Sequence, residues 1–140
     1  MAVLDLVTIP NSILNEPCDE VTIFDDRLKD LVDNMFETMH YHKGIGLAAP
    51  QIGILHRLCV CEVETEKIVL INPVLTAQIK PIKSDEGCLS IPQMMYEVDR
   101  YEQVTVNAMN LDGESFRVSA KGLMAIVIQH EMDHLDGVLI

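Results

Sequence analysis

The chain has 140 residues, of which 49% are hydrophobic and 23% charged, a composition that predicts one globular domain spanning residues 1–140. Its net charge of −12, with only ten scattered basic residues, excludes a protein that binds nucleic acid by neutralising phosphates. The sequence has no signal-like amino terminus and no apolar run near the ~20 residues that cross a bilayer, so we expect a cytoplasmic protein with no membrane partner.

Residues 1–24 are punctuated by Ile9-Pro10 and Glu16-Pro17, which favours an irregular segment over a helix. A helix is predicted next, capped by Asp25 or Asp26 and ended by Gly44. Its apolar stripe has helical spacing and consists of Leu28, Leu31, Val32, Met35, Phe36 and Met39. The histidines at its end, His40 and His42, are expected to be solvated rather than to bind a metal.

A segment of small residues follows at 44–51, with the sequence GIGLAAPQ. Its glycines and alanines allow another backbone or a substrate to come close, although a tight loop explains the pattern equally well. Its one polar side chain is that of Gln51.

Alternation of side chains predicts strands at 57–63, 68–71 and 74–82, with Asn72-Pro73 ending the second. A hairpin is predicted at 104–118 around Asp112 and Gly113. Cys59 and Cys61 are expected in the core, and Cys18 is expected to be half-buried.

Cys88 lies in the segment EGCLS, residues 86–90. It follows a glycine and is flanked by polar groups, which favours an accessible thiolate. The sequence has no Cys-x-x-Cys pair and no secretory context, so this thiol is a candidate metal ligand or nucleophile rather than half of a disulfide. A buried, inert thiol is the third possibility.

A buried helix is predicted at 123–136, ended by Gly137, and it carries QHEMDH at 129–134. His130 and His134 share one helix face and can bind one metal ion, with Glu131 beside them as a proton acceptor. The alternative is a polar helix end whose histidines only cap carbonyls. A catalytic metal site usually takes three protein ligands; downstream only Asp136 is available, and upstream Cys88 is the best-placed candidate.

The three segments at 44–51, 86–90 and 129–134, in this order and at this spacing, resemble the three signature motifs of peptide deformylases. The similarity extends from near residue 1 through Gly137. It implies an α+β fold in which antiparallel β-sheets surround a buried metal-bearing helix. It also implies removal of the N-formyl group from the formyl-methionine of newly synthesised proteins, with release of formate. The partner would then be the formyl-methionyl nascent peptide, bound by a monomer.

By the same resemblance, the metal ligands would be Cys88, His130 and His134, and Glu131 would be the general acid/base. The oxyanion hole would be formed by the Gln51 amide and the Leu89 backbone N–H. Gly46 would pair with the peptide backbone, and the methionine pocket would be lined by Ile45, Leu123, Ile126 and Val127. One divalent ion per chain is implied, with Fe²⁺ as the native ion and Zn²⁺ or Ni²⁺ possible in isolated protein.

The sequence also departs from the family pattern. Many bacterial members have a further C-terminal helix implicated in ribosome docking, whereas this sequence stops at Ile140. It is either a shortened version of a longer protein or a naturally short form of the kind that some bacteriophages encode, so the resemblance does not imply ribosome docking. Residues 93–96, QMMY, replace a stretch that often contains a substrate-contacting arginine, so the preference for residues after methionine is expected to differ. Ser84 stands where many members have an apolar pocket residue.

Two other functions account for part of the same pattern. A zinc endopeptidase with the same His-Glu-x-x-His helix is weakened by the lack of a distant downstream ligand. A structural or electron-transfer module with two histidines and one cysteine, as in blue-copper sites, would leave Glu131 and Gln51 without a role.

Overall fold

The structure is a computed structural model that describes residues 2–139, apart from the side chains of residues 92 and 93. Five antiparallel strands form one sheet in the order β1-β2-β3-β4-β5. Their bounds are Gly46–Ala48 (β1), Leu58–Val63 (β2), Glu66–Cys88 (β3), Ile91–Met109 (β4) and Ser115–Lys121 (β5). With two α-helices, this is the predicted α+β fold.

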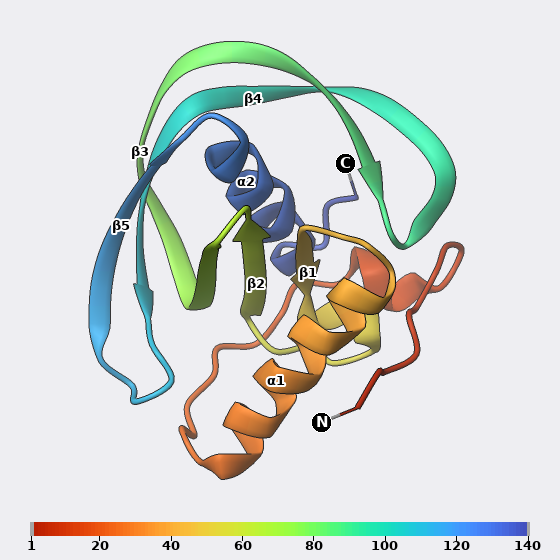
Figure 1. The fold of residues 1–140 in the computed structure, drawn as a ribbon, viewed down its shortest axis with the longest axis vertical. Coiled ribbons are helices and arrows are strands. Elements are labelled where there is room, and N and C mark those ends of the chain that lie inside the picture. Colours follow the sequence, from red (N-terminus) through yellow and green to blue (C-terminus); the bar gives the residue numbers. More distant parts are fainter. Residues whose placement is uncertain (1, 140) are drawn as a thin grey trace.

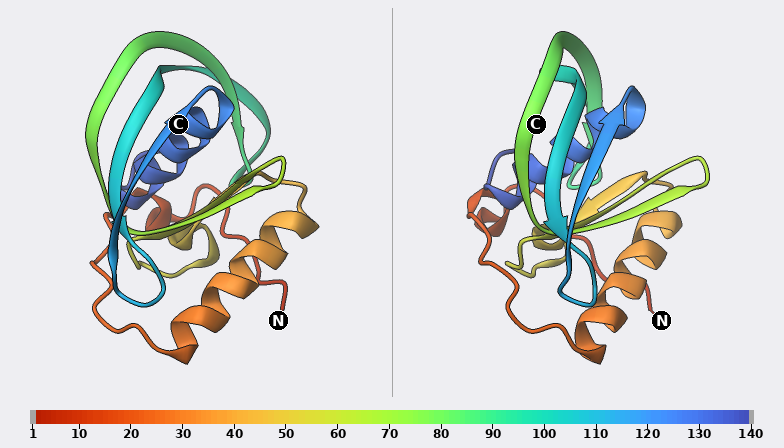
Figure 2. Two further views of the ribbon diagram at one scale, coloured as in Figure 1. Left: turned by 60° about the vertical axis from the view of Figure 1, so that its left-hand side comes forward. Right: turned by 90° about the vertical axis from the view of Figure 1, so that its left-hand side faces the viewer.

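Strands β3 and β4 curve together into a long arch over helix α2 (Leu123–Leu135), as Figures 1 and 2 show. The pairing of β3 is irregular between Ile71 and Val74, and within this interval Asn72 has a φ of 52°. Asparagine tolerates this left-handed conformation better than most residues. The Asn72 side chain also binds the backbone N–H and C=O of Val21, each at 2.8 Å. The irregularity therefore redirects the strand and anchors the amino-terminal segment.

The prediction of separate strands at 68–71 and 74–82 is wrong, because β3 continues through Pro73 and Pro81. Proline lacks an N–H group and is usually confined to strand edges and bulges. Pro73 lies in the irregular stretch. Within the described residues, β3 from Val74 onward is paired only with β4, so one of its edges is open and can accommodate Pro81.

The remaining strand predictions are confirmed. Strand β2 begins one residue inside the predicted range, at Leu58. The hairpin joins β4 to β5 through a turn in which Gly113 has a φ of 79° and donates its N–H to the Asn110 carbonyl at 3.0 Å. The GIGLAAPQ segment is more regular than a loop, since it forms β1 and then a short 3₁₀-helix, η2 (Ala49–Ile52).

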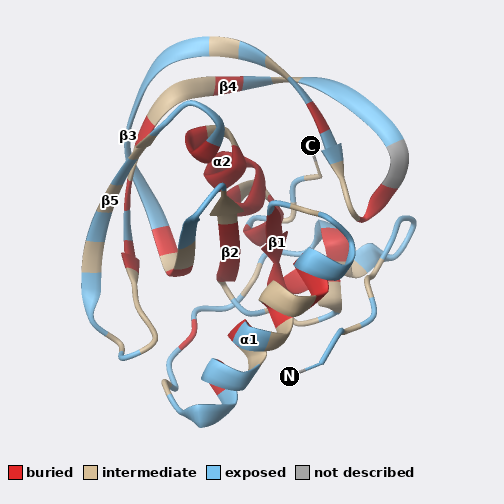
Figure 3. Ribbon diagram, viewed as in Figure 1, coloured by how far each residue is buried: buried red, intermediate tan, exposed pale blue. Residues whose placement is uncertain are grey.

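Helix α2 lies inside the arch and is buried along most of its length (Figure 3). It packs on side chains of β2, β3 and β4, among which Cys59 and Cys61 are fully buried as predicted. The helix ends at Leu135, one residue before the predicted end, and Gly137 follows as the expected stop. At Gly137 φ is 79°, and a Cβ would lie 2.6 Å from the Asn15 carbonyl oxygen. Glycine is therefore required at this position by both conformation and space.

Helix α1 (Asp26–Tyr41) belongs to a second apolar cluster, which includes residues of β1 and β2. The Asp25 side chain caps it by accepting the Leu28 N–H at 3.1 Å. The helix ends just before Gly44 as predicted, but the residue in the left-handed conformation is Lys43, with a φ of 58°. His40 and His42 are exposed on the surface, as expected.

The amino-terminal segment is mostly irregular, as predicted, with one short 3₁₀-helix, η1 (Ser12–Asn15). Its backbone contacts two of the motifs: the Val7 N–H donates to the Gln51 carbonyl at 2.7 Å, and the Ile9 N–H donates to the Ser90 carbonyl at 3.0 Å. Cys18 is half-buried, and burial raises the pKa of its thiol to about 11. No helix within residues 2–139 is long and apolar enough to cross a membrane.

Candidate active site

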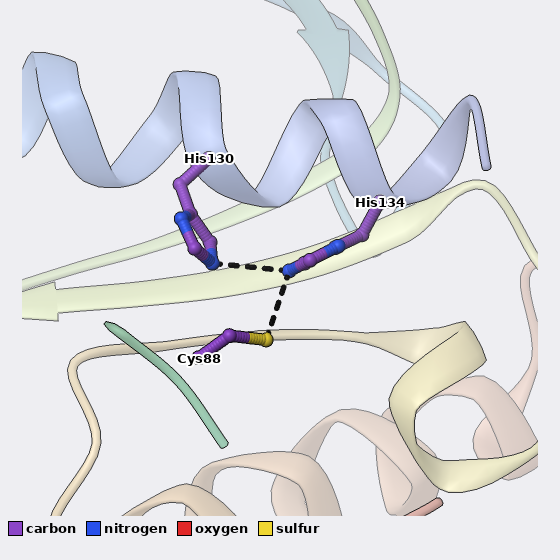
Figure 4. A group of neighbouring side chains, drawn as sticks. All are labelled: Cys88, His130 and His134. Carbon is purple, nitrogen blue, oxygen red and sulfur yellow. Dashed lines mark hydrogen bonds between the residues drawn. The ribbon is translucent and has the colours of Figure 1, made fainter. Parts of the chain in front are cut away.

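Three potential metal-binding side chains meet between α2 and the end of β3 (Figure 4). The Nε2 atoms of His130 and His134 are 3.0 Å apart, and the Cys88 Sγ is 3.4 Å from the His134 Nε2. The two histidines come from one face of α2, one helical turn apart, and the cysteine comes from the last residue of β3. The structure thus brings together the three residues that the sequence predicts as metal ligands.

The second ring nitrogen of each histidine is already occupied. The His134 Nδ1 lies 3.1 Å from the Val138 carbonyl, which can only accept, so this Nδ1 carries a hydrogen. The His130 Nδ1 lies 2.8 Å from the Glu86 carboxylate, which fixes the same tautomer. In the neutral rings, both Nε2 atoms therefore present lone pairs to each other. Two lone pairs at this separation repel unless a cation lies between them.

The donor set fits a divalent transition-metal ion. A tetrahedral ion with bonds of about 2.3 Å to sulfur and about 2.05 Å to nitrogen holds such atoms about 3.3 to 3.6 Å apart. The observed separations of 3.0 and 3.4 Å are close to this spacing. One thiolate and two imidazoles are also ligands that Zn²⁺ and Fe²⁺ accept.

The two histidines have opposite tendencies to ionise. Burial, together with the neighbouring His130, lowers the pKa of His134 to about 3. Burial also opposes charge on His130, but contacts with Cys88 and Glu86 outweigh it and raise the pKa of His130 to about 10. In the metal-free cluster one positive charge, on His130, is therefore favoured, whereas a second positive charge on His134 is disfavoured.

A buried ionic network behind His130 was missed by the sequence analysis. Glu86 accepts two hydrogen bonds from Arg100, at 2.9 Å from Nε and 2.8 Å from Nη2, while Arg100 Nη1 lies 2.6 Å from Asp133. Burial tends to raise the pKa of Glu86, but bonds from His130 and Arg100 bring it down to about 2. Glu86 thus stays ionised and orients the imidazole.

The signals for this network in the sequence differ in strength. Glu86 lies two residues before Cys88, and residues with this spacing share one face of a regular strand. This spacing could have identified Glu86, although the structure has an irregular register between the two residues. Arg100 lies 14 residues after Glu86 in the sequence. The two side chains meet only because β3 pairs with β4.

Glu131 is 4% exposed, and its Oε1 has no hydrogen-bond partner among the described residues. Burial raises the pKa of its carboxyl to about 7, although the neighbouring His130 and Arg100 act in the opposite direction. A carboxyl group with this pKa can gain or lose a proton near neutral pH, which suits a general acid/base.

Gln51 is held in one orientation by its own short helix. Its Oε1 accepts the Ala48 N–H at 2.9 Å, and because a backbone N–H can only donate, the amide oxygen is identified. The Nε2 then points toward the Cys88 Sγ at 3.5 Å and the Ser90 Oγ at 3.4 Å. The side chain presents N–H donors beside the metal-binding cluster.

These groups line one cleft of about 600 Å³. From the predicted site it includes Ile45, Gly46, Gln51, Cys88, Leu89, Leu123, Ile126, Val127, His130 and Glu131. His134 lies behind the cleft and is 1% exposed. Among the predicted pocket residues, Val127 is buried, whereas Ile45 and Leu123 are exposed at the mouth.

The polypeptide deformylase family model matches residues 3–140. The chain belongs to the polypeptide deformylase family. It is 48% identical over 144 residues to the peptide deformylase of Acidobacterium capsulatum, with 99% of this chain and 85% of the relative covered. It is 46% identical over 141 residues to peptide deformylase 1 of Bacillus subtilis, with 99% and 88% covered.

Solved structures agree with this assignment. The peptide deformylase of Thermotoga maritima matches with a TM-score of 0.95 and 36% identity, covering 98% of this deformylase and 94% of that chain. The peptide deformylase of Synechococcus elongatus, crystallised with actinonin, matches with a TM-score of 0.94 and 43% identity, covering 97% and 75%. The predicted family, fold and enzyme class are confirmed, and this deformylase removes the N-formyl group of nascent peptides. The endopeptidase alternative is not favoured.

Proposed function

We propose that this deformylase binds one divalent ion between Cys88, His130 and His134 and hydrolyses formyl-methionyl peptides with Glu131 as general acid/base. The observation that carries the proposal is the pair of Nε2 atoms that face each other at 3.0 Å while both Nδ1 hydrogens are engaged elsewhere. The raised pKa of His130 means that a proton can lie between the two Nε2 atoms in metal-free protein. The Cys88 sulfur beside the same two atoms supports a metal ion in that place, because it completes a set of three ligands.

The bound ion would supply Lewis acidity and would lower the pKa of water from 15.7 to about 7, which makes water a nucleophile near neutral pH. We propose Fe²⁺ as the native ion on the strength of the family resemblance. Zn²⁺ or Ni²⁺ could replace it, because a thiolate and two imidazoles suit all three ions. The Glu86–Arg100 pair supports His130 as a metal ligand, because Glu86 holds the ring in the tautomer that leaves Nε2 free to bind an ion.

Glu131 would accept the proton of the attacking water and pass it to the nitrogen of the departing amine. The unpartnered Oε1 is free to receive that proton. The raised pKa supports both steps, since a carboxyl group that titrates near neutrality can release the proton again.

As the formyl carbon becomes tetrahedral, its oxygen gains negative charge. The Gln51 Nε2 and the Leu89 backbone N–H would donate to this oxygen, and one such donor is worth about 3 kcal/mol in related sites. The fixed orientation of the Gln51 amide supports the assignment, because a donor that is already aimed needs no reorganisation during the reaction.

The methionine side chain would occupy the apolar part of the cleft, against Ile45, Leu123, Ile126 and Val127, while Gly46 pairs with the peptide backbone. A single chain supplies all these groups, which supports a monomer as the active unit. Formyl-methionyl nascent peptides are made in the cytoplasm or an equivalent compartment, where we place the enzyme. The net charge of −12 supports contact with the peptide rather than with nucleic acid.

The proposal is tested by formate release from formyl-Met-Ala-Ser after anaerobic loading with Fe²⁺ or Zn²⁺, with chelator-treated protein as control. We expect formate and intact Met-Ala-Ser as the products, with no activity in the chelated sample. Cleavage of the Met–Ala bond, or equal formate release without metal, would overturn the proposal.

A further inference from the structure

Four exposed apolar side chains surround the mouth of the catalytic cleft. Ile45 precedes β1, Leu123 begins α2, and Met94 and Met95 lie near the start of β4. Their exposed fractions are 43%, 53%, 49% and 67%. Single exposed apolar residues are ordinary, but a group of them around one concave site marks a binding surface.

Met95 has a defined place in this group. A Cβ at Gly87 would lie 3.0 Å from the Met95 Sδ, so the thioether rests on the glycine backbone. Gly87 immediately precedes Cys88, which places Met95 beside the reacting centre rather than at a remote edge. Methionine is unbranched and polarisable, and it adapts to apolar groups of different shape.

The charge of the cleft also favours an apolar side chain over an acidic one. Among its lining residues that the structure describes, none is lysine or arginine, whereas Asp85 is exposed there. Asp85 is paired across the β3–β4 ladder with Glu97. Like charges in directly opposite positions repel each other, and an acidic side chain brought to this mouth would add to that repulsion.

We infer that Met95, assisted by Met94, is a specificity-determining residue for the peptide beyond its formyl-methionine, selecting an apolar side chain and rejecting aspartate and glutamate. The inference rests on the proposed function, because the peptide must place its formyl-methionine in this cleft. A cleft of about 600 Å³ lies within the range of sites that enclose ligands larger than one side chain.

The position that meets Met95 is limited by backbone geometry. Successive side chains of an extended peptide point to opposite sides. If the methionine points into the pocket, only one of the next two residues can contact Met95. A preference should therefore occur at the second or the third position of the peptide, but not equally at both.

Kinetics on two peptide series test the inference. Formyl-Met-X-Ser and formyl-Met-Ala-X are compared with X as Leu, Ala, Lys or Glu. At one position we expect kcat/KM for Leu to exceed that for Glu by about tenfold, the range that one apolar contact supports. Met95→Ala should reduce the preference for Leu, Met95→Leu should retain it, and Met95→Lys should raise the rate with Glu.

The matched control is Ile79→Ala, since Ile79 is 52% exposed on β3 and does not line the cleft; it should leave all the ratios unchanged. A preference that is absent, or that is the same in Met95→Ala as in the unmodified enzyme, would overturn the inference. If no formyl peptide is hydrolysed, the proposed function fails instead.

A binding measurement tests the inference without turnover. In zinc-loaded enzyme labelled with ¹³C at the methionine methyl groups, the Met95 signal is assigned by its loss in Met95→Leu. We expect the product peptide Met-Leu-Ser, or Met-Ala-Leu if the third position is the one selected, to shift this signal more than its glutamate counterpart does. Unchanged Met95 resonances at saturating peptide would refute the contact.

Discussion

The α-carbon of Gly46 lies directly against the carboxylate of Glu131, so that a Cβ at position 46 would be 2.9 Å from the Glu131 Cδ. Strand β1 and helix α2 therefore approach each other at a point where neither backbone can move easily. Gly46 is paired with Cys61 of β2, and Glu131 is on a buried helix. The absence of a side chain at residue 46 sets the position of the carboxylate.

We expect Gly46→Ala to displace the Glu131 carboxylate while leaving the metal ligands in place. A shift of about 1 Å in a catalytic group can cost about 10²-fold in rate. The measurement is kcat for formyl-Met-Ala-Ser together with metal content by elemental analysis. A variant that binds metal normally and also keeps its full rate would show that the carboxylate tolerates this displacement.

Glu131→Gln should retain the metal but lose about 10² to 10⁴-fold in kcat, because the amide keeps the shape of the carboxyl group and cannot take a proton. Its stability above pH 7 should equal or exceed that of the unmodified enzyme, because the amide carries no charge, whereas burial disfavours the ionised form of the Glu131 carboxyl. Urea denaturation and formate release on the same samples test both expectations. Turnover near the unmodified rate would remove Glu131 from the mechanism.

Cys88→Ser should weaken metal binding, because a neutral hydroxyl is a poor replacement for a thiolate. The matched control is Cys18→Ser, which changes a half-buried thiol outside the cluster and should leave metal content unchanged. Competition with a chromophoric chelator measures both affinities. Equal affinities in the two variants would move the third ligand away from Cys88.

Arg100→Leu should destabilise the fold by roughly 3–5 kcal/mol, because it leaves the buried Glu86 carboxylate without its guanidinium partner. The side chains of Arg100 and Glu86 are only 5% and 7% exposed. The control is Lys83→Leu, which removes an exposed ion pair with Asp99 and should change stability little. Urea titrations of metal-free protein at pH 7 give the comparison, and similar losses in both variants would contradict the expectation.

The same pair predicts a pH dependence. The folded protein lowers the pKa of Glu86 from 4.5 to about 2, so this carboxylate contributes stability above pH 4.5 and loses that contribution as the pH falls toward 2. The difference in unfolding free energy between Arg100→Leu and the unmodified protein should therefore narrow over that interval. A difference that stays constant from pH 5 to pH 2 would show that the Glu86 charge does not carry the effect.

The metal-binding cluster could be predicted because each of its residues can be recognised from a short segment of sequence. His130 and His134 are related by helical spacing, and Cys88 was the one accessible thiol in a polar context. Glu86 and Arg100 could not be paired in the same way, since their contact depends on the register of two long strands. The orientation of Gln51 could not be predicted either, because it depends on a hydrogen bond from the Ala48 N–H at the end of β1.

The strands were predicted less well than the helices for a related reason. Proline and Asn-Pro normally end a strand, and the sequence alone does not reveal that β3 has an open edge beyond Val74. Helix α1, by contrast, has its cap at Asp25 and its apolar stripe within a single local segment, and it forms as expected.

The hydrogen bond from the His134 Nδ1 to the Val138 carbonyl has a consequence for when the protein becomes active. During synthesis, residue 138 must leave the ribosome before the ring that bears a proposed metal ligand can be held in its final orientation. Earlier in translation, neither Cys88 nor His130 can complete the cluster. We therefore expect a nascent chain that has not yet exposed Val138 to bind metal more weakly, even when all three proposed ligands have already been made.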